Sequence, residues 1–402
     1  MPNKRKIIND PVYGFITINN DLIFTILSHP FFQRLRRVHQ MALAYLVYPG
    51  AVHTRLHHSL GAYHLMCNAV NELRAKGTQI TEEEEIAVKA AILLHDTGHG
   101  PFSHALENQL INVPHENISL QIMQSMNKEL NGQLNMAIDI FTNQYHKKFL
   151  HQLVSGQLDV DRMDYLTRDS FFSGVSEGVI GYDRILKMLT VHNGELMVEE
   201  KGIYSIEKFL VARRQMYWQV YLHKTVLAAE KILINILKRV RELHNNGDKN
   251  LITGTVTDYF LFEFNGKMNE AVLKKFCELD DIDFSFAVKK WCHHSDFVLS
   301  ELCTRILNRE LLKIKLQSEP FDEKIIHQKL IDAKVQLNID DSLVSYFVFT
   351  GEAVNTLYRT EDERINILFK DNTVKDISTI DDPLIHQTIS SPVKKFYICS
   401  IS

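Results

Sequence analysis

Histidine and aspartate gather in one short stretch of the sequence. An apolar run over 90–94 ends in adjacent His95 and Asp96, and His99 and His104 follow closely. Glycines and a proline at 98–101 end the helix that the run predicts. Adjacent helical residues point about 100° apart, which suits two ligands of one ion better than a charge relay. The negative end of a helix dipole can stabilise a single histidine at a helix C-terminus. It does not explain three histidines and an aspartate within ten residues, so the stretch predicts a metal site.

Two other stretches could complete that site. His58 lies near a stripe of leucines in a helix predicted to run to about Arg74. A lone inward-facing histidine is usually a core residue, but beside the His-Asp pair it becomes a third candidate ligand. Asp161, Tyr165 and Asp169 share one face of another helix. They could form an exposed ladder of salt bridges, but the apolar residues between them indicate burial, and buried carboxylates need a cation or hydrogen-bond donors.

Arginines and aromatic residues could bind an anionic ligand in two further places. Three arginines at 34, 36 and 37 are typical of a solvated face, and guanidinium groups also suit anions. A long amphipathic helix predicted over 205–240 places charged and aromatic residues on one face: Arg213, Tyr217, Tyr221 and Lys224. Its aromatic residues could simply be core. A face that mixes charge with aromatic rings is nevertheless what a nucleotide pocket requires.

The rest of the chain predicts the elements that position these residues. We expect a hairpin over 7–18 and helices over 21–27, 31–41 and 82–96, the last capped by Thr81. A polar turn at 245–250 marks the expected boundary between two domains, 1–245 and 246–402. Beyond it we expect helices over 268–279 and 285–316, and strands over 346–349, 364–369 and 396–401. The pattern predicts a mainly α protein with a helical core, a helical extension and a small α+β C-terminal part.

Composition narrows the class of protein. The 402 residues carry a formal net charge of −4, which argues against bulk nucleic-acid binding as the main role. No apolar run approaches the ~20 residues of a membrane span, so no membrane partner is expected. The five cysteines are scattered without CxxC spacing, which favours a reducing, cytoplasmic location over a disulfide framework.

Taken in order, these stretches resemble the HD-domain phosphohydrolases. His58, His95, Asp96 and Asp161 form the H…HD…D pattern of that superfamily. Stretches at 32–36, 49–55, 95–104, 158–169 and 217–224 look like the deoxynucleoside triphosphate triphosphohydrolases, including the catalytic domain of the SAM-and-HD-domain enzyme and its bacterial relatives. The resemblance covers about residues 6–240, and the C-terminal third is only loosely similar. It implies an HD-domain helical core.

The resemblance also implies roles for individual residues. The H…HD…D residues would bind one divalent metal ion, whose identity (Fe, Mn, Zn, Ni or Mg) a mixed His/carboxylate site leaves open. In catalysis His104, oriented by Glu107, would handle protons or hold the nucleophile, and His99 and His115 match further active-site histidines. The triphosphate would be held by Arg55, Arg162 and Arg213. The sugar 3′-hydroxyl would be held by Gln40, Tyr165 and Asp169, with Tyr221 closing against the sugar and disfavouring a 2′-hydroxyl.

The implied reaction is metal-dependent hydrolysis of deoxynucleoside triphosphates (dNTPs) to deoxynucleoside and tripolyphosphate, by water attack at the α-phosphorus. The alternatives are an HD phosphohydrolase for another nucleotide or phosphoester, and a nucleotide-sensing module without turnover. Four residues match family positions that bind an activating nucleotide between subunits, which implies a homo-oligomer (dimer or tetramer): Lys6, Asn9, Gln33 and Arg36. Ser28 stands where the family has an acid that reads guanine, which argues against a guanine-selective activator.

Overall fold

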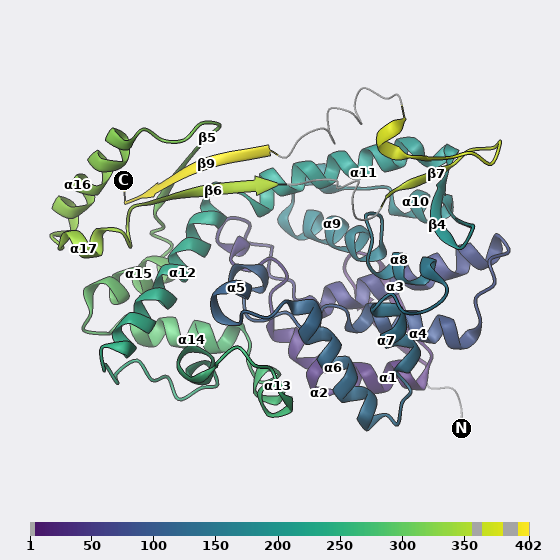
Figure 1. Cartoon of the computed structure of the whole chain (residues 1–402), viewed down its shortest axis with the longest axis horizontal. Helices are drawn as coiled ribbons and strands as arrows, with labels where there is room; N and C mark the ends of the chain where they lie inside the picture. The colour runs from purple at the N-terminus through teal and green to yellow at the C-terminus, as the bar shows by residue number, and fades with distance from the viewer. Residues whose placement is uncertain (1–4, 356–363, 381–392, 402) are drawn as a thin grey trace.

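The structure, a computed structural model, describes residues 5–355, 364–380 and 393–401 of the chain (Figure 1). The side chains at 104, 108, 355 and 393 lie outside that description. One continuous apolar core runs from Ile16 to Ile401 and therefore joins the two halves of the chain. Within the described residues, none of the helices combines the length and the apolar character needed to cross a membrane.

The first part of the chain is a small hairpin followed by packed helices. Its elements are β1 (Lys6–Asp10), β2 (Gly14–Ile18), α1 (Asp21–Ser28), α2 (Pro30–Gln33), α3 (Arg55–Ala75), α4 (Glu82–Leu94), α5 (Glu107–Leu110), α6 (His115–Glu129), α7 (Asn135–Phe141), α8 (Lys148–Val154), α9 (Val160–Ser173) and α10 (Tyr182–Met188). Helix α3 packs against both α4 and α9. These three helices form the frame of the candidate site.

Local sequence explains where two of these helices begin and how closely they pack. Thr81 and Glu84 form a capping box at the start of α4, in which each side chain satisfies a free backbone N–H of the other. Gly61 in α3 faces α9, and a Cβ at this position would lie 2.0 Å from the Asp164 carboxylate and 2.1 Å from the Arg168 guanidinium. The glycine therefore allows α3 and α9 to approach with a buried ion pair between them.

The second part adds further helices and two small sheets. Its elements are β3 (Leu189–His192), β4 (Glu195–Glu199), α11 (Ile203–Met216), α12 (Lys224–Asn245), α13 (Glu270–Phe276), α14 (Asp281–Trp291), α15 (Phe297–Leu307), β5 (Lys313–Gln317), α16 (Glu323–Leu337), α17 (Asp341–Val344), β6 (Phe349–Asn355), β7 (Asn366–Leu368), β8 (Val374–Asp376) and β9 (Val393–Ser400). One sheet has the order β3-β4-β7-β8 and the other β5-β9-β6. Figure 1 shows the second sheet beside α16 and α17, away from α3 and α4.

The mainly α architecture with small C-terminal sheets is confirmed. The division at residue 245 stays a prediction. Strand β7 pairs in parallel with β4, with Val198 opposite Ile367. One sheet therefore contains strands from both sides of residue 245.

The helix predicted over 31–41 is wrong. After α2 the chain makes a 3-10 turn over Arg34–Arg37 and becomes extended at Val38. The cause is the burial of Arg34, whose guanidinium donates to the carbonyls of Leu279, Thr97 and His99 at 2.7, 3.3 and 2.8 Å. Arg34 is therefore not part of a solvated face, although Arg36 and Arg37 are exposed.

Two long helix predictions are also wrong. The helix predicted over 205–240 is two helices, because the chain widens into a π-helical turn at Tyr217–Tyr221 and restarts at α12, where the His223 side chain caps the new N-terminus. The region 285–316 holds two helices and strand β5, because Asp296 caps α15 and separates it from α14. The helical spacing of apolar residues continues across both breaks. The breaks are marked instead by the N-capping residues His223 and Asp296.

Gly61→Ala should lower the free energy of unfolding by about 1–3 kcal/mol, the usual cost of overpacking a core, since both contacted side chains are buried and cannot move aside. Urea denaturation measures this change. Gly181→Ala is the matched control, because its φ of −84° suits alanine and no atom lies within 4 Å of the new Cβ. Equal stability of the two variants would contradict the packing argument.

Candidate active site

Four potential ligands from three helices meet at one point. His58 comes from α3, His95 and Asp96 from the end of α4, and Asp161 from the first turn of α9. The Asp161 Oδ1 atom lies 3.0 Å from His58 Nε2 and 3.4 Å from His95 Nε2. Asp96 closes the ring, with its carboxylate oxygens 3.5 Å from His58 Nε2 and 3.4 Å from His95 Nε2. Ligands at about 2.1 Å from an octahedral ion lie about 3 Å apart, so His58, His95 and Asp161, whose ligand atoms all lie within 4.8 Å of one another, fit one ion. Asp96 borders this group through two different oxygens and also groups with His99 and His115.

The protonation chemistry of the cluster also fits a cation. Both Nε2 atoms are buried and have no well-formed hydrogen bond among the described residues. Burial lowers the pKa of His58, but the adjacent carboxylates of Asp161, Asp164 and Asp96 outweigh burial and raise it to about 10. Burial raises the pKa of Asp161, but the two imidazoles lower it further than burial raises it. In the absence of a metal the imidazoles must therefore hold protons to balance the carboxylates, and a divalent ion would replace those protons.

Neighbouring groups fix the orientation of both imidazoles. His58 Nδ1 donates to Asp164 Oδ2 at 2.7 Å, and His95 Nδ1 donates to the Ile92 carbonyl at 2.6 Å. Each Nε2 lone pair is thereby directed at the cluster, as in metal-bound histidines generally. Asp164 is paired with Arg168 at 3.0 Å, and Arg168 reaches Asp10 at 2.8 Å.

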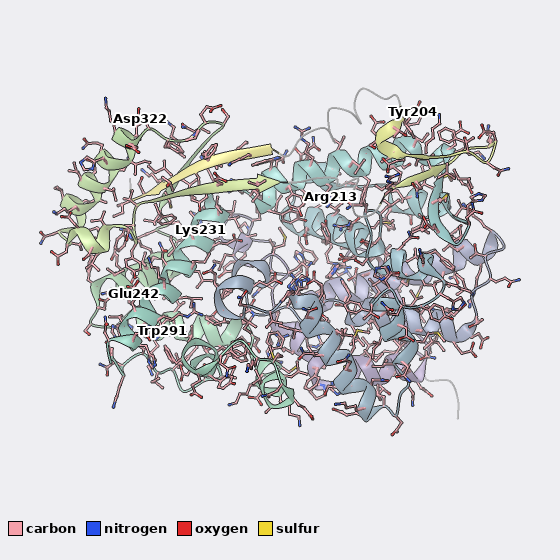
Figure 2. The ribbon with its side chains drawn as sticks, in the orientation of Figure 1. Tyr204, Arg213, Lys231, Glu242, Trp291 and Asp322 are labelled. Atoms are coloured by element: carbon pink, nitrogen blue, oxygen red, sulfur yellow. The ribbon has the colours of Figure 1, made fainter. Side chains whose placement is uncertain are left out.

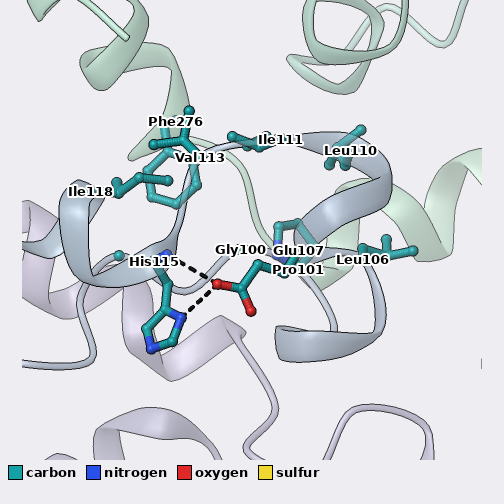
Figure 3. A pocket seen from close by; sticks show the side chains of 11 residues that line it. Gly100, Pro101, Leu106, Glu107, Leu110, Ile111, Val113, His115, Ile118 and Phe276 are labelled. Atoms are coloured by element: carbon teal, nitrogen blue, oxygen red, sulfur yellow. Dashed lines mark hydrogen bonds and ion pairs between the residues drawn. The ribbon is translucent and has the colours of Figure 1, made fainter. Parts of the chain in front are cut away.

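A second group of histidines borders the ligands. His99 Nε2 lies 3.3 Å from Asp96 Oδ1, and the His99 ring stacks on His115 with centroids 3.8 Å apart. Burial, and then the charge of Arg55, lower the pKa of His99 well below its usual value. Figure 3 shows one Glu107 oxygen accepting from both the backbone N–H and the Nδ1 of His115, at 3.0 and 2.6 Å. The side chain of His104 lies outside the described residues, so its predicted role stays a prediction.

The loop that carries these histidines is held from several sides. Ser119 Oγ accepts from the Gly98 N–H at 2.8 Å and donates to the His95 carbonyl at 2.6 Å. Gly98 has no room for a side chain, because a Cβ would lie 2.0 Å from the His115 carbonyl. From α14, Asp281 accepts from the Phe102 N–H at 2.8 Å, where the backbone is left-handed. Buried Arg34 binds the same loop, so its geometry depends on distant parts of the chain.

A cavity of about 570 Å³ opens beside the ligands. It is lined by six of the seven residues predicted to bind substrate: Gln40, Arg55, Arg162, Tyr165, Asp169 and Tyr221. Arg55 forms an ion pair with Asp96 and donates to Ser103 Oγ at 2.9 Å. Arg162 forms an ion pair with Asp159 at 3.3 Å. The exception is Arg213, which is buried, donates to Gln157 at 3.1 Å and is not among the lining residues (Figure 2 marks its place on α11).

One wall of the cavity is a hydrogen-bonded group around Asp169. Its Oδ1 accepts from His53 Nε2 at 2.7 Å, and its Oδ2 accepts from the Tyr221 hydroxyl at 2.7 Å. Burial and the nearby Asp169 charge raise the pKa of Tyr221 well above its usual value, so the phenol keeps its proton. Each carboxylate oxygen retains a second lone pair for a ligand hydroxyl.

The residues predicted to bind an activating nucleotide lie elsewhere. None of Lys6, Asn9, Gln33 and Arg36 lines the cavity. Lys6, Asn9 and Arg36 are exposed, and Arg36 donates to Gln33 at 2.7 Å. Their role between subunits stays a prediction.

Several supporting residues were missed from the sequence. Asp164 and Arg168 are four residues apart on α9, a spacing that signals an ion pair, but only the fold shows that the pair holds His58. His53 and Asp281 belong to segments far from Asp169 and the loop in sequence. No local pattern pointed to these two contacts.

Comparisons with known proteins agree with this geometry. The HD domain family matches residues 55–169, and the HD associated region matches residues 180–264. An uncharacterized protein of Bacillus subtilis, YwfO, is 31% identical over 387 residues, which cover 94% of this chain and 88% of that protein. The crystal structure of a phosphohydrolase from Bacteroides thetaiotaomicron is 50% identical, with a TM-score of 0.93 over 99% of this chain and 100% of that one.

The chain therefore belongs to the HD-domain phosphohydrolases. It is also 29% identical over 264 residues to the human deoxynucleoside triphosphate triphosphohydrolase SAMHD1, a match that covers 54% of this chain and 42% of that protein.

Replacing a ligand should remove the metal. His95→Gln should abolish stoichiometric binding of a divalent ion, and Asp164→Asn should weaken it about 10–100-fold, the usual cost of losing a partner of a ligating histidine. Elemental analysis after dialysis against graded Mn²⁺ measures both. His64→Gln is the control, because His64 lies on α3 against Tyr13 and Asn68, away from the cavity. One tightly bound ion per chain in His95→Gln would contradict the assignment.

Metal binding should strengthen as the pH rises from 6 to 8. The metal-free His58 has its pKa raised to about 10 and is protonated throughout this range, so each ion must displace at least one proton. Affinity should rise up to about tenfold per pH unit for each proton displaced. Titration calorimetry in buffers of different ionisation enthalpy counts the protons. An affinity that does not change with pH would show that the imidazoles are not ligands.

Proposed function

We propose that this protein hydrolyses deoxynucleoside triphosphates to deoxynucleoside and tripolyphosphate. One observation carries the proposal: a four-ligand cluster, two cavity arginines and the hydrogen-bonded Asp169–Tyr221 pair all line or border the same cavity of about 570 Å³. Ligand pockets for small molecules have volumes of this size. The SAMHD1 relatives are deoxynucleoside triphosphate triphosphohydrolases, which supports the same substrate class.

Each part of the substrate has a counterpart among the cavity residues. Arg55 and Arg162 place positive charge near the ligand cluster, where the triphosphate would lie. Asp169 offers its free lone pairs to the 3′-hydroxyl of the sugar. Tyr221, fixed by its bond to Asp169, would lie against the sugar and leave little room for a 2′-hydroxyl.

The reaction requires one bond to form and one to break. The oxygen of water bonds to the α-phosphorus, the bond to the 5′-oxygen breaks, and a proton reaches that oxygen. A divalent ion held by His58, His95, Asp96 and Asp161 would lower the pKa of water and polarise a phosphoryl oxygen. The imidazoles of His99 and His115 border the ligands, and we assign proton transfer to them and to His104. Arg55 and Arg162 would stabilise the charge that grows on the phosphate oxygens.

Product analysis tests this assignment. With Mn²⁺ and each of the four dNTPs in H₂¹⁸O, anion-exchange chromatography and mass spectrometry should find deoxynucleoside and tripolyphosphate in equal amounts, with the label in tripolyphosphate. Asp96→Asn should lose at least about 100-fold in kcat/KM, since it removes a metal ligand. Release of orthophosphate or pyrophosphate would indicate an HD phosphohydrolase acting at another bond. Binding without turnover would indicate the nucleotide-sensing alternative.

A further inference from the structure

One acidic side chain in the cavity takes no part in the proposed hydrolysis. Glu230 lies on α12, one helical turn after Val226, and both residues line the cavity. No hydrogen bond or ion pair to the Glu230 carboxylate is found among the described residues. Its side chain is only partly exposed. Without a ligand such an acceptor can take donors only from water, and a bound ligand can supply them in its place.

Glu230 lies beyond the residues that would hold the sugar, where the base of a bound nucleotide would lie. Tyr221 marks the sugar end of the cavity through its bond to Asp169. From there the chain continues through Leu222 and Val226, which also line the cavity, to Glu230, about 6 Å beyond Val226 along the helix. Figure 2 labels the next residue, Lys231, on this part of α12.

The neighbouring wall is apolar. Met41, Ala42 and Ala44 line the cavity together with Leu222 and Val226. Apolar side chains suit an aromatic ring, and a few polar groups among them decide which ring is accepted. The ligand cluster, the Asp169–Tyr221 pair and this wall with Glu230 thus match phosphate, sugar and base.

We infer that Glu230 reads the base of the substrate and favours bases that present N–H donors, guanine most of all. This inference rests on the proposed function. A carboxylate only accepts hydrogen bonds. Guanine presents two adjacent donors, N1–H and N2–H₂, to such a pair of oxygens. Adenine and cytosine present one amino group beside an acceptor nitrogen, and thymine presents one N–H between two carbonyl oxygens, which a carboxylate repels.

The raised pKa of Glu230 is consistent with a carboxylate that has no hydrogen-bond donor beside it in the described part of the chain. Burial raises the pKa of Glu230 to about 7, and the neighbouring Lys231 opposes that rise only in part. Two donors from a base would stabilise the anion. The test is therefore made at pH 8, where the free side chain is ionised.

Competition between substrates gives the sharpest test. The Mn²⁺-loaded protein receives dGTP and dTTP together, and the two deoxynucleosides released give the ratio of the kcat/KM values. The wild type should favour dGTP. Glu230→Gln replaces one acceptor oxygen by an N–H₂ donor. This donor would oppose one of the guanine donors and weaken guanine binding, but it could donate to a carbonyl oxygen of thymine. The dGTP/dTTP ratio should fall about 5- to 100-fold, the usual discrimination of a paired base contact.

Controls separate this role from folding and from catalysis. Glu270→Gln makes the same chemical change on an exposed part of α13 and should leave the ratio unchanged. Equilibrium dialysis with the products provides a readout without turnover: deoxyguanosine should bind more weakly to Glu230→Gln than to the wild type, and thymidine should not. Equal melting temperatures confirm that Glu230→Gln folds.

The outcomes distinguish the two proposals. Tripolyphosphate release with a dGTP/dTTP ratio that Glu230→Gln changes less than twofold overturns the base-reading role and leaves the proposed function intact. A wild type that prefers dTTP also overturns the base-reading role. No turnover of any dNTP, together with deoxyguanosine binding that depends on Glu230, overturns the proposed function and supports the base contact.

Discussion

Two carboxylates and two imidazoles meet at the edge of the cavity, with both imidazoles and Asp96 largely buried, and the rest of the structure depends on balancing their charge. Asp96 and Asp161 could not remain ionised there without cations nearby. Arg55 pairs with Asp96 from the cavity side. Behind His58, a buried chain of contacts runs through Asp164 and Arg168 to Asp10 on the N-terminal hairpin. This chain of contacts fixes the spacing of α3 and α9, and Gly61 is the residue that permits it.

The second dependence is on the C-terminal part of the chain. The loop that follows His95 and Asp96 has left-handed backbone at Phe102 and Ser103, which is costly for residues other than glycine. Asp281 accepts from the Phe102 N–H, and Arg34 bridges the loop carbonyls to Leu279. The segment around Leu279–Asp281 therefore supports the histidine loop, and the HD core is not independent of the extension that follows it.

The sequence predicted the cluster because its signals are local. His95 and Asp96 are adjacent at a helix end, and the period of α9 placed Asp161, Tyr165 and Asp169 on one face. The capping box at Thr81 likewise marked the start of α4 correctly. Helical geometry and the chemistry of metal ligands pointed to each of these stretches separately, and the resemblance to the HD-domain phosphohydrolases joined His58 and Asp161 to the His95–Asp96 pair as one ligand set.

The remainder depends on contacts between distant segments. The sequence around Arg34 is typical of a solvated face. Arg34 is buried because it donates to the carbonyls of Thr97 and His99, which lie more than sixty residues away in the chain. The break at Tyr217–Tyr221 leaves the apolar period of the helix intact, so periodicity alone could not reveal it. Glu230 lies within an amphipathic helix, and only the fold shows that its side chain lines a cavity.

The most direct test of the account is the position of the metal. Crystals of the Mn²⁺-loaded protein, measured for anomalous scattering at the manganese edge, should show one ion about 2.0–2.3 Å from His58 Nε2, His95 Nε2 and carboxylate oxygens of Asp96 and Asp161. An ion held instead by the Glu107–His115–Glu116 group, or no ordered ion between α3, α4 and α9, would contradict it.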